Sequence, residues 1–338
     1  MSIQPSTPAV ASEPVGLGLG RGYWRTTLLA YLYLLPTILI LGTFHFLPIF
    51  YAFYVSLNNW GLINKGFVGL ANYAEALGSP DLWNSMLVTL SYALGTVPLT
   101  LFLSMICAYL LFKKVRGLGI YRTAYFLPYV TSTVGAAAVW TWLFHPQFGP
   151  INIALSVVGI HGLRWLQEPQ GVFSIVAQAL GVSLPNGLAG PSLALVAIMV
   201  VAIWHSLGFD VAVLLAGLGN IPSELLEAGR IDGANETQIL RHLVAPLLMP
   251  TVFFLVVIST IGSLQTFNEI YVMSSSVNVG SNAGGPLHTT ESIVVNIYNQ
   301  FYSFHRVGYG SAVGFILFGI ILVFTLIELR FIGRRVDY

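Results

Sequence analysis

Apolar residues gather in six long runs along the chain, and short polar connectors separate these runs. A helix needs roughly 20 mainly apolar residues to cross the hydrocarbon core of a bilayer, and each run reaches this length. The runs cover residues 28–56, 85–112, 122–144, 192–218, 247–273 and 309–329. A seventh apolar stretch, residues 171–183, is too short to cross and is predicted to form a surface or interfacial helix. The pattern therefore predicts an all-α membrane protein with six transmembrane helices.

The composition agrees with a chain whose main solvent is lipid. Hydrophobic residues make up 56% of the 338 residues, charged residues make up 8%, and the mean hydropathy is +0.78. A soluble domain carries roughly 25% charged residues. The net charge of +1 gives no reason to expect a nucleic-acid partner, and the single cysteine, Cys107, cannot form a disulfide within the chain. We therefore expect a multi-pass protein of the cell (inner) membrane, surrounded by membrane lipid.

The N-terminal residues differ from the rest. Residues 1–20 are rich in Pro, Ser, Gly and Ala and carry one charge, Glu13. Such a composition favours disorder, and the segment lacks the basic start and short apolar core of a cleavable signal peptide. We expect residues 1–24 to form a disordered cytoplasmic tail and residues 25–338 to form a transmembrane permease domain.

Lysine and arginine are distributed unevenly between the two sets of connectors. If the N-terminus lies in the cytoplasm, the basic residues on that side are Arg21, Arg25, Lys113, Lys114, Arg116, Arg122, Arg230, Arg241, Arg330, Arg334 and Arg335, and those outside are Lys65, Arg164 and Arg306. Cytoplasmic connectors are enriched in Lys and Arg. This bias predicts that both termini and the connector 220–246 are cytoplasmic, and that the insert 145–190 lies outside.

The connector between the fourth and fifth runs, ELLEAGRIDGANETQILRHLVAPLLMP at residues 224–250, is unusually polar for this chain. It holds six of the 27 Asp, Glu, Lys and Arg residues, while its flanks are strongly apolar. Leu225, Leu226 and Ile231 recur at helical spacing, Gly233 interrupts the pattern, and Asn235 with a glutamine three residues later is typical of a capping box. We predict two short amphipathic helices with a glycine corner. Composition alone favours a simpler interpretation, a solvated loop between two helices.

This connector resembles the EAA motif of binding-protein-dependent ABC importer permeases. Glu227, Ala228, Gly233 and Pro246 stand at the motif's offsets, with Gly229 in place of the second alanine, and with Val244 and Ala245 as departures near the end of the motif. The stretches LLPTILILGTFHFLPIFYAFYVSLNNW, IWHSLGFDVAVLLAGLGNIPSELLEAGRIDGA and FNEIYVM also have counterparts, in the same order. Over residues 25–335 the chain resembles the carbohydrate-uptake group that contains the maltose F and glycerol-phosphate A subunits.

The resemblance implies a type I ABC importer permease fold and a set of partners. These are a second homologous permease subunit in a heterodimer, an ABC ATPase dimer and an extracytoplasmic solute-binding protein. It also implies that the connector couples to the ATPase, through Glu227, Ala228, Gly229, Asp232, Gly233 and Pro246. None of the lysines, Lys65, Lys113 and Lys114, has the context of a phosphate-binding loop. We therefore expect a transport subunit rather than an enzyme, with no cofactor and no metal, and ATP hydrolysis by a separate subunit.

Polar residues inside the fourth and fifth runs are candidates for a solute site, since ionisable groups in a membrane are costly and often functional. His205 and Asp210 lie in the fourth run. In the fifth, Ser259, Ser263 and Thr266 form one helical stripe that Asn268 and Glu269 follow. The resemblance adds Ala202, Ser206, Phe209 and Gly262 as positions that line the solute cavity. Packing between helices also favours small polar residues, so the stripe, His205 and Asp210 keep structural alternatives.

Two functions follow, and they differ in their source of energy. The first is an ATP-driven importer of a sugar, oligosaccharide or polyol. A neutral solute is favoured because no Lys or Arg lies in this zone, although a partner subunit could supply one. The alternative is an ion-coupled secondary transporter with Asp210, Glu269 and His205 as its relay. Such transporters often contain inverted repeats, and no clear repeat is visible in this chain. A membrane scaffold without transport is a third class.

Overall fold

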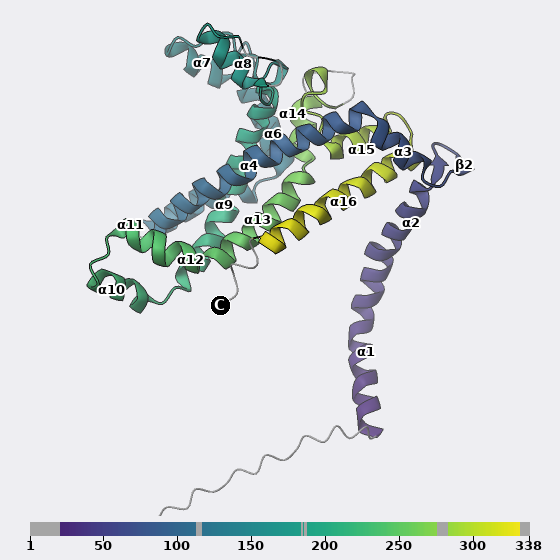
Figure 1. Cartoon of the computed structure of the whole chain (residues 1–338), viewed down its shortest axis with the longest axis horizontal. Helices are drawn as coiled ribbons and strands as arrows, with labels where there is room; N and C mark the ends of the chain where they lie inside the picture. Colours follow the sequence, from purple (N-terminus) through teal and green to yellow (C-terminus); the bar gives the residue numbers. More distant parts are fainter. Residues whose placement is uncertain (1–20, 113–116, 184, 186–187, 276–282, 332–338) are drawn as a thin grey trace, which may run out of the picture. The chain divides into compact units, whose positions relative to one another are not determined.

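The computed structural model describes the chain except residues 1–20, 113–116, 184, 186–187, 276–282 and 332–338 (Figure 1). It divides into two compact units, residues 1–54 and 55–338. Most of the expected N-terminal tail lies outside the described residues. Its last four residues do not form a disordered tail, because helix α1 already begins at Arg21.

The first unit is one long apolar helix. It consists of α1 (Arg21–Leu41), a π-helical turn (Gly42–Phe46) and α2 (Leu47–Ser56), whose last two residues belong to the second unit. Pro36 lies within α1. A proline in a spanning helix is tolerated because local adjustments of the helix satisfy the backbone groups that it frees. The predicted first span is therefore confirmed as a helix.

The second unit begins with a hairpin of β1 (Asn58–Trp60) and β2 (Asn64–Phe67). The helices that follow are α3 (Ala71–Gly78), α4 (Pro80–Phe112), α5 (Leu118–Val130), α6 (Thr133–Leu143), α7 (Pro150–Val157), η2 (Trp165–Gln167), α8 (Val172–Ala179), α9 (Leu193–Gly219), α10 (Ser223–Ile231), α11 (Glu236–Ile239), η4 (Leu240–Val244), α12 (Ala245–Leu247), α13 (Met249–Leu264), α14 (Asn268–Ser275), η5 (Pro286–His288), α15 (Ile293–Tyr302) and α16 (Val307–Phe331). The short apolar stretch at 171–183 contains α8, and the insert 145–190 contains α7, η2 and α8.

Five helical segments of the described chain are long and apolar enough to cross a membrane. They are Trp24–Ser56, Pro80–Phe112, Leu193–Gly219, Met249–Ser275 and Val307–Phe331. The predicted span 122–144 is not a single helix, since it divides into α5 and α6 around Thr131 and Ser132. Pro128 lies in the last turn of α5, Thr131 is extended, and the Ser132 hydroxyl accepts a hydrogen bond from Gly135 N to begin α6. Hydropathy alone does not reveal such a break.

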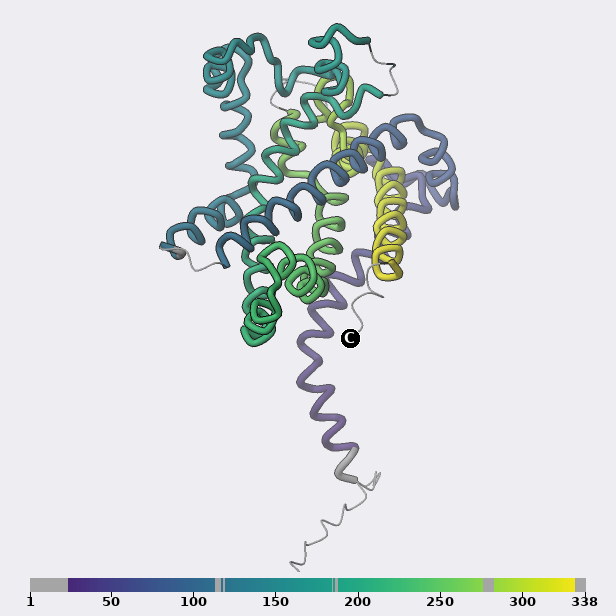
Figure 2. Tube along the Cα trace, turned by 60° about the vertical axis from the view of Figure 1, so that its left-hand side comes forward, coloured from purple at the N-terminus to yellow at the C-terminus, as the bar shows by residue number. Residues whose placement is uncertain are grey.

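The core of this unit is built around α9, which packs against α4, α5 and α13, and α4 crosses both α9 and α13 (Figure 2). One cluster of buried residues joins the first half of α9 to α4 and α14, with Tyr92, Leu195, Ile198 and Ile270 among its members. A second cluster joins the other half of α9 to the end of α4 and the 220–246 connector. The connector therefore contributes buried residues to the core, Ile239 and Val244 among them.

The crossing of α5 and α9 depends on Gly208. A Cβ at this position would collide with the carbonyl oxygen of Tyr125, and small residues let membrane helices approach this closely. Gly208→Val is expected to lower the free energy of unfolding by about 1–3 kcal/mol, the usual cost of overpacking. The measurement is the thermal unfolding midpoint of the purified protein. Gly319→Val in α16 is the control, since a Cβ there contacts nothing within 4 Å. Equal midpoints in the two variants would contradict this account.

Candidate functional site

A cavity of about 320 Å³, with hydroxyl and carboxyl groups in its lining, lies between α4, α9 and the α13–α14 segment. Its lining residues are Tyr92, Thr96, Val97, Thr100, Tyr129, Ala202, His205, Ser206, Phe209, Asp210, Ile258, Ser259, Gly262, Ser263, Thr266 and Glu269. The cavity therefore collects side chains from helices that are far apart in the sequence and otherwise strongly apolar.

The structure brings most of the predicted solute-site residues to this cavity. Five come from α9, namely Ala202, His205, Ser206, Phe209 and Asp210. Five more come from the α13–α14 segment, namely Ser259, Gly262 and Ser263 of α13, Thr266 in the break between the helices, and Glu269 of α14. Steps of three and four residues keep the five α9 residues on one helical face, and likewise Ser259, Gly262 and Ser263 of α13. Asn268 is not among the lining residues and is exposed. Because residues 265–267 interrupt the helix, the face of α13 does not continue to this position.

A third wall of the cavity was missed in the sequence. It comes from α4, where Tyr92, Thr96 and Thr100 recur every four residues. The Thr96 hydroxyl donates to Tyr92 O at 2.8 Å, and the Thr100 hydroxyl donates to Thr96 O at 2.8 Å. Hydroxyls bonded in this way still have lone pairs that can accept a further bond. This wall could have been predicted from the sequence, since its polar residues recur at helical spacing, as those on α13 do.

The hydroxyls on the α9 and α13 walls are held in a similar way. Ser206 Oγ donates to Ala202 O, and Ser263 Oγ donates to Ser259 O at 2.7 Å. Thr266 Oγ1 lies 3.4 Å from Tyr92 OH and 3.3 Å from Glu269 Oε2. These hydroxyl protons already have acceptors, so the serines and threonine present mainly acceptor lone pairs to the cavity.

Aromatic rings form one side of the cavity. Tyr129 at the end of α5 stacks on Phe209, with ring centroids 5.1 Å apart, and lies 6.2 Å from the His205 ring. His205 Nε2 is 3.3 Å from Thr131 O, in the break between α5 and α6. The helix break thus places Tyr129 and a backbone carbonyl beside the predicted α9 residues.

Two carboxyl groups, Asp210 and Glu269, line the cavity, and no Lys or Arg does so among the described residues. Asp210 is 2% exposed, and its Oδ2 atom has no hydrogen-bond partner in the described part of the chain. A buried polar atom left without a partner costs free energy that a bound donor would recover. The cavity therefore suits a solute rich in hydroxyl donors. Within the described residues no group of three or more His, Cys, Asp or Glu could hold a metal ion.

The connector has the predicted corner between two short helices. Helix α10 ends in a Schellman motif, because Ala234 N donates to Gly229 O at 3.0 Å and Gly233 N donates to Arg230 O at 3.1 Å. Gly233 has a φ of +80°, which favours glycine. The predicted capping box is confirmed, with Asn235 and Gln238 bonded to each other's backbone N–H at the start of α11.

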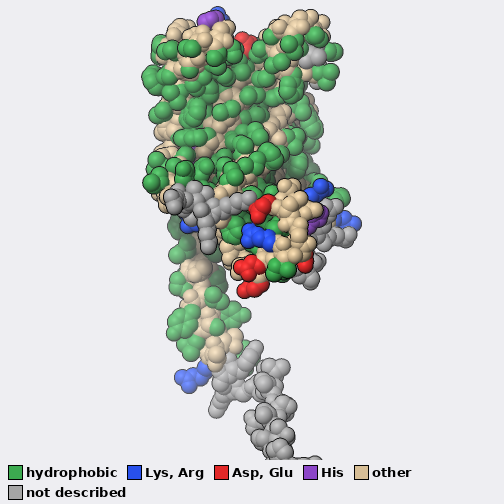
Figure 3. All heavy atoms as spheres, turned by 90° about the vertical axis from the view of Figure 1, so that its left-hand side faces the viewer, with side chains coloured by type: hydrophobic (Ala, Val, Ile, Leu, Met, Phe, Trp, Pro, Cys, Tyr) green, Lys and Arg blue, Asp and Glu red, His purple; other side chains and the backbone are tan. Residues whose placement is uncertain are grey.

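The predicted coupling residues lie on the surface of this connector. Glu227, Ala228, Asp232, Gly233 and Pro246 are exposed. Gly229 is half-buried, and a Cβ there would lie 2.8 Å from Leu243 Cδ1, so the glycine allows α10 to pack closely against η4. Acidic and basic side chains gather in the lower part of the face shown in Figure 3, beneath a surface that is largely hydrophobic. The connector thus combines a rigid corner with a charged surface.

The apolar helices, the cavity with hydroxyl and carboxyl groups in its lining, and the charged connector that packs into the core are the features of a multi-pass membrane permease. Residues 68–338 match the family described as the binding-protein-dependent transport system inner membrane component. The chain belongs to this family, which confirms the relationship inferred from the EAA motif.

Two relatives and one solved structure show the extent of the similarity. The trehalose/maltose transport system permease protein MalF of Thermococcus litoralis is 30% identical over 92% of this chain and 95% of its own length. The sn-glycerol-3-phosphate transport system permease protein UgpA of Agrobacterium fabrum is 30% identical over 92% and 97%. A chain of a bacterial alginate ABC transporter, solved with an alginate-bound periplasmic protein, has a TM-score of 0.74 at 20% identity, over 91% of this chain and 95% of that one. This likeness confirms the predicted type I permease fold.

Proposed function

We propose that the chain is the permease subunit of an ATP-driven ABC importer whose solute is a neutral sugar, oligosaccharide or polyol. The observation that supports this most directly is the lining of the cavity between α4, α9 and α13. It offers hydroxyl acceptors, two carboxyl groups and the stacked Tyr129–Phe209 pair. Solute sites commonly combine apolar or aromatic walls with a few placed polar groups, and a polyhydroxy solute matches both.

The charge of the cavity favours a neutral solute over an anionic one. MalF is named for trehalose and maltose, UgpA for sn-glycerol 3-phosphate, and the similar solved structure is of an alginate transporter. A phosphate or uronate would face Asp210 and Glu269, with no Lys or Arg among the described lining residues to offset them. Like charges placed together disfavour binding.

The proposed assembly contains three kinds of partner. These are a second homologous permease subunit that completes a heterodimer, an ABC ATPase dimer, and an extracytoplasmic solute-binding protein. The family description itself refers to binding-protein-dependent transport. Since the sequence has no phosphate-binding loop, ATP hydrolysis is assigned to the ATPase. Family membership also argues against the ion-coupled alternative.

The proposed orientation places both termini and the 220–246 connector in the cytoplasm. It rests on the distribution of Lys and Arg in the sequence. The connector would then face the ATPase with Glu227, Asp232 and Gly233, which are exposed, and with Ala228 beside them.

The test is uptake by the complete importer reconstituted in liposomes. Maltose, trehalose and glycerol serve as neutral probes, and glycerol 3-phosphate and alginate oligosaccharides as anionic ones. Saturable uptake of at least one neutral probe is expected, and it should require both ATP and the binding protein. Uptake driven by an ion gradient without ATP, or uptake confined to anionic probes, would contradict the proposal.

A further inference from the structure

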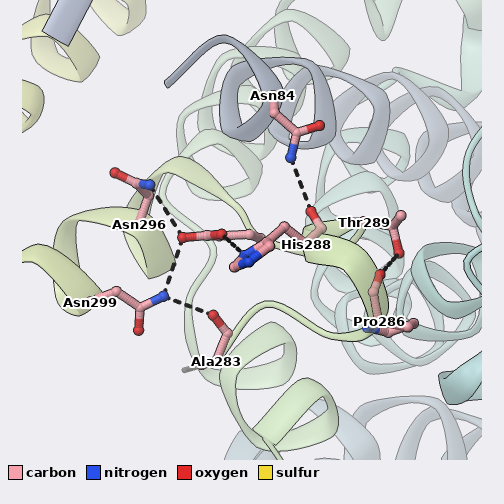
Figure 4. Close-up of polar contacts among 8 residues, drawn as sticks. Asn84, Ala283, Pro286, His288, Thr289, Asn296 and Asn299 are labelled. Carbon is pink, nitrogen blue, oxygen red and sulfur yellow. Dashed lines mark hydrogen bonds and ion pairs between the residues drawn. The ribbon is translucent and has the colours of Figure 1, made fainter. Parts of the chain in front are cut away.

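Residues 283–292, here called the junction turn, form a strained connection that leads into α15 (Figure 4). Leu287 and His288 have φ values of 52° and 58°, in the left-handed region that non-glycine residues rarely adopt. Gly285 has a φ of 68°. Strained backbone persists where surrounding contacts determine it, so the contacts of this turn indicate what it does.

The carboxyl group of Glu291 is the centre of these contacts. This residue is 5% exposed, and its Oε1 accepts hydrogen bonds from Asn296 Nδ2 and Asn299 Nδ2, each at 3.2 Å. Its Oε2 pairs with His288 Nδ1. The Asn299 amide also donates to Ala283 O at 2.8 Å. Glu291 therefore fastens the strained part of the turn to the first turns of α15, and its partner Asn299 holds the start of the turn.

The junction turn is tied to α4 at two points. Asn84 Nδ2 donates to His288 O at 3.1 Å, a contact visible in Figure 4. Ile293 N, the first residue of α15, donates to Thr89 Oγ1 at 2.9 Å. Thr89 lies one helical turn from Tyr92, so the second tie is close to the α4 wall of the cavity.

The junction turn is also tied to the other two cavity walls. Ser292 Oγ donates to Thr266 O at 3.2 Å, at the end of the α13 wall. Ser192 Oγ, which caps the start of α9, lies 3.5 Å from Thr289 O. The turn thus joins α4, α9 and the end of α13, which carry most of the cavity lining, and one tie ends on Thr266, a lining residue.

We propose that Glu291 is a positioning residue for the solute cavity. It holds the junction turn in its strained form, and the turn in turn fixes α4, α9 and the end of α13 relative to one another. Glu291 does not line the cavity, so it acts on solute through Thr266 and the α4 wall. This inference rests on the proposed function, because it takes the cavity as the solute site.

The main test compares Glu291→Leu with Glu291→Gln in the complete importer. Leucine removes both carboxyl oxygens, so the buried amides of Asn296 and Asn299 lose the acceptor that they share. Glutamine keeps an oxygen for Asn296 and Asn299, and its amide can donate to a neutral His288 ring. We expect Glu291→Leu to raise the KM for uptake roughly ten-fold, and Glu291→Gln to remain near the unaltered protein. A purely structural role would lower the amount of complex and the maximal rate but not the KM of the assembled fraction.

Two further variants keep the test decisive. Thr89→Val removes the acceptor of Ile293 N at nearly constant volume, together with the bond that the Thr89 hydroxyl donates to Ser85 O within α4. It should raise KM even if Glu291→Leu fails to assemble. Glu75→Gln is the control, since its carboxyl group pairs with Arg306 away from the junction turn, and its KM should be unchanged. A normal KM in Thr89→Val, or equal defects in both Glu291 variants, would overturn the inference. If the cavity variant Asp210→Asn also keeps a normal KM, the assignment of the cavity as the solute site in the proposed function fails as well. If Asp210→Asn alone raises KM, only the role of Glu291 is rejected.

Discussion

Gly233→Val is expected to abolish solute uptake while the protein still inserts and folds. Gly233 has a φ of +80° and closes the Schellman motif between α10 and α11. A residue with a Cβ pays about 1–2 kcal/mol in this conformation, and a β-branched one is especially disfavoured. The corner should therefore open, and the charged surface of the connector should no longer match its ATPase partner. Uptake and ATPase co-purification are the measurements.

Gly162→Val provides a closely matched control for this experiment. Gly162 has a φ of +78°, and a Cβ would contact nothing within 4 Å at either glycine. The two substitutions therefore impose the same local strain, but only Gly233 lies on the proposed coupling surface. We expect near-normal uptake in Gly162→Val. Normal uptake and normal ATPase binding in Gly233→Val would mean that the 220–246 connector is only a solvated link.

Local patterns in the sequence were sufficient to predict this corner and much of the cavity. The capping box at Asn235 depends on residues only three apart, and the EAA motif locates the glycine. The α9 and α13 walls follow from helical periodicity, because residues three or four apart, such as Ser259 and Ser263, share a face of a helix. Thr266 also lines the cavity, although it lies in the break between α13 and α14. The same periodicity wrongly placed Asn268 in the cavity, because the helix is interrupted before this residue.

Features that depend on contacts between distant segments could not be predicted in this way. In the run 122–144, Pro128 and Ser132 are local signals for a helix end and a new start, but no local pattern indicates that Tyr129 turns toward Phe209. The role of Glu291 could not be predicted, because it depends on hydrogen bonds to two asparagines and on a turn that is bonded to α4. One of these bonds joins Ile293 N to Thr89, 204 residues away. Periodicity identifies a face of one helix, whereas the partner of that face is set by tertiary packing.

Asp210→Asn is expected to weaken solute uptake more than any other single change of similar size in the cavity. Asp210 is 2% exposed, lines the cavity, and has an Oδ2 atom without a hydrogen-bond partner among the described residues. A solute hydroxyl that donates to this oxygen would supply the missing bond. Hydrogen bonds to charged groups contribute about 1.5–3 kcal/mol. Losing one corresponds to a rise in KM of roughly 10- to 100-fold.

The alternative role of Asp210 is to tie α9 to a neighbouring helix, and Glu328→Gln separates the two. Glu328 is a second carboxyl group within an apolar helix, and its Oε1 accepts a bond from Thr260 at 2.7 Å, which links α16 to α13. It does not line the cavity. If Asp210 binds solute, Asp210→Asn should raise KM with little loss of the assembled protein, and Glu328→Gln should leave KM unchanged. If both variants instead lower the thermal unfolding midpoint and neither alters KM, Asp210 is a packing residue and the solute must be bound elsewhere.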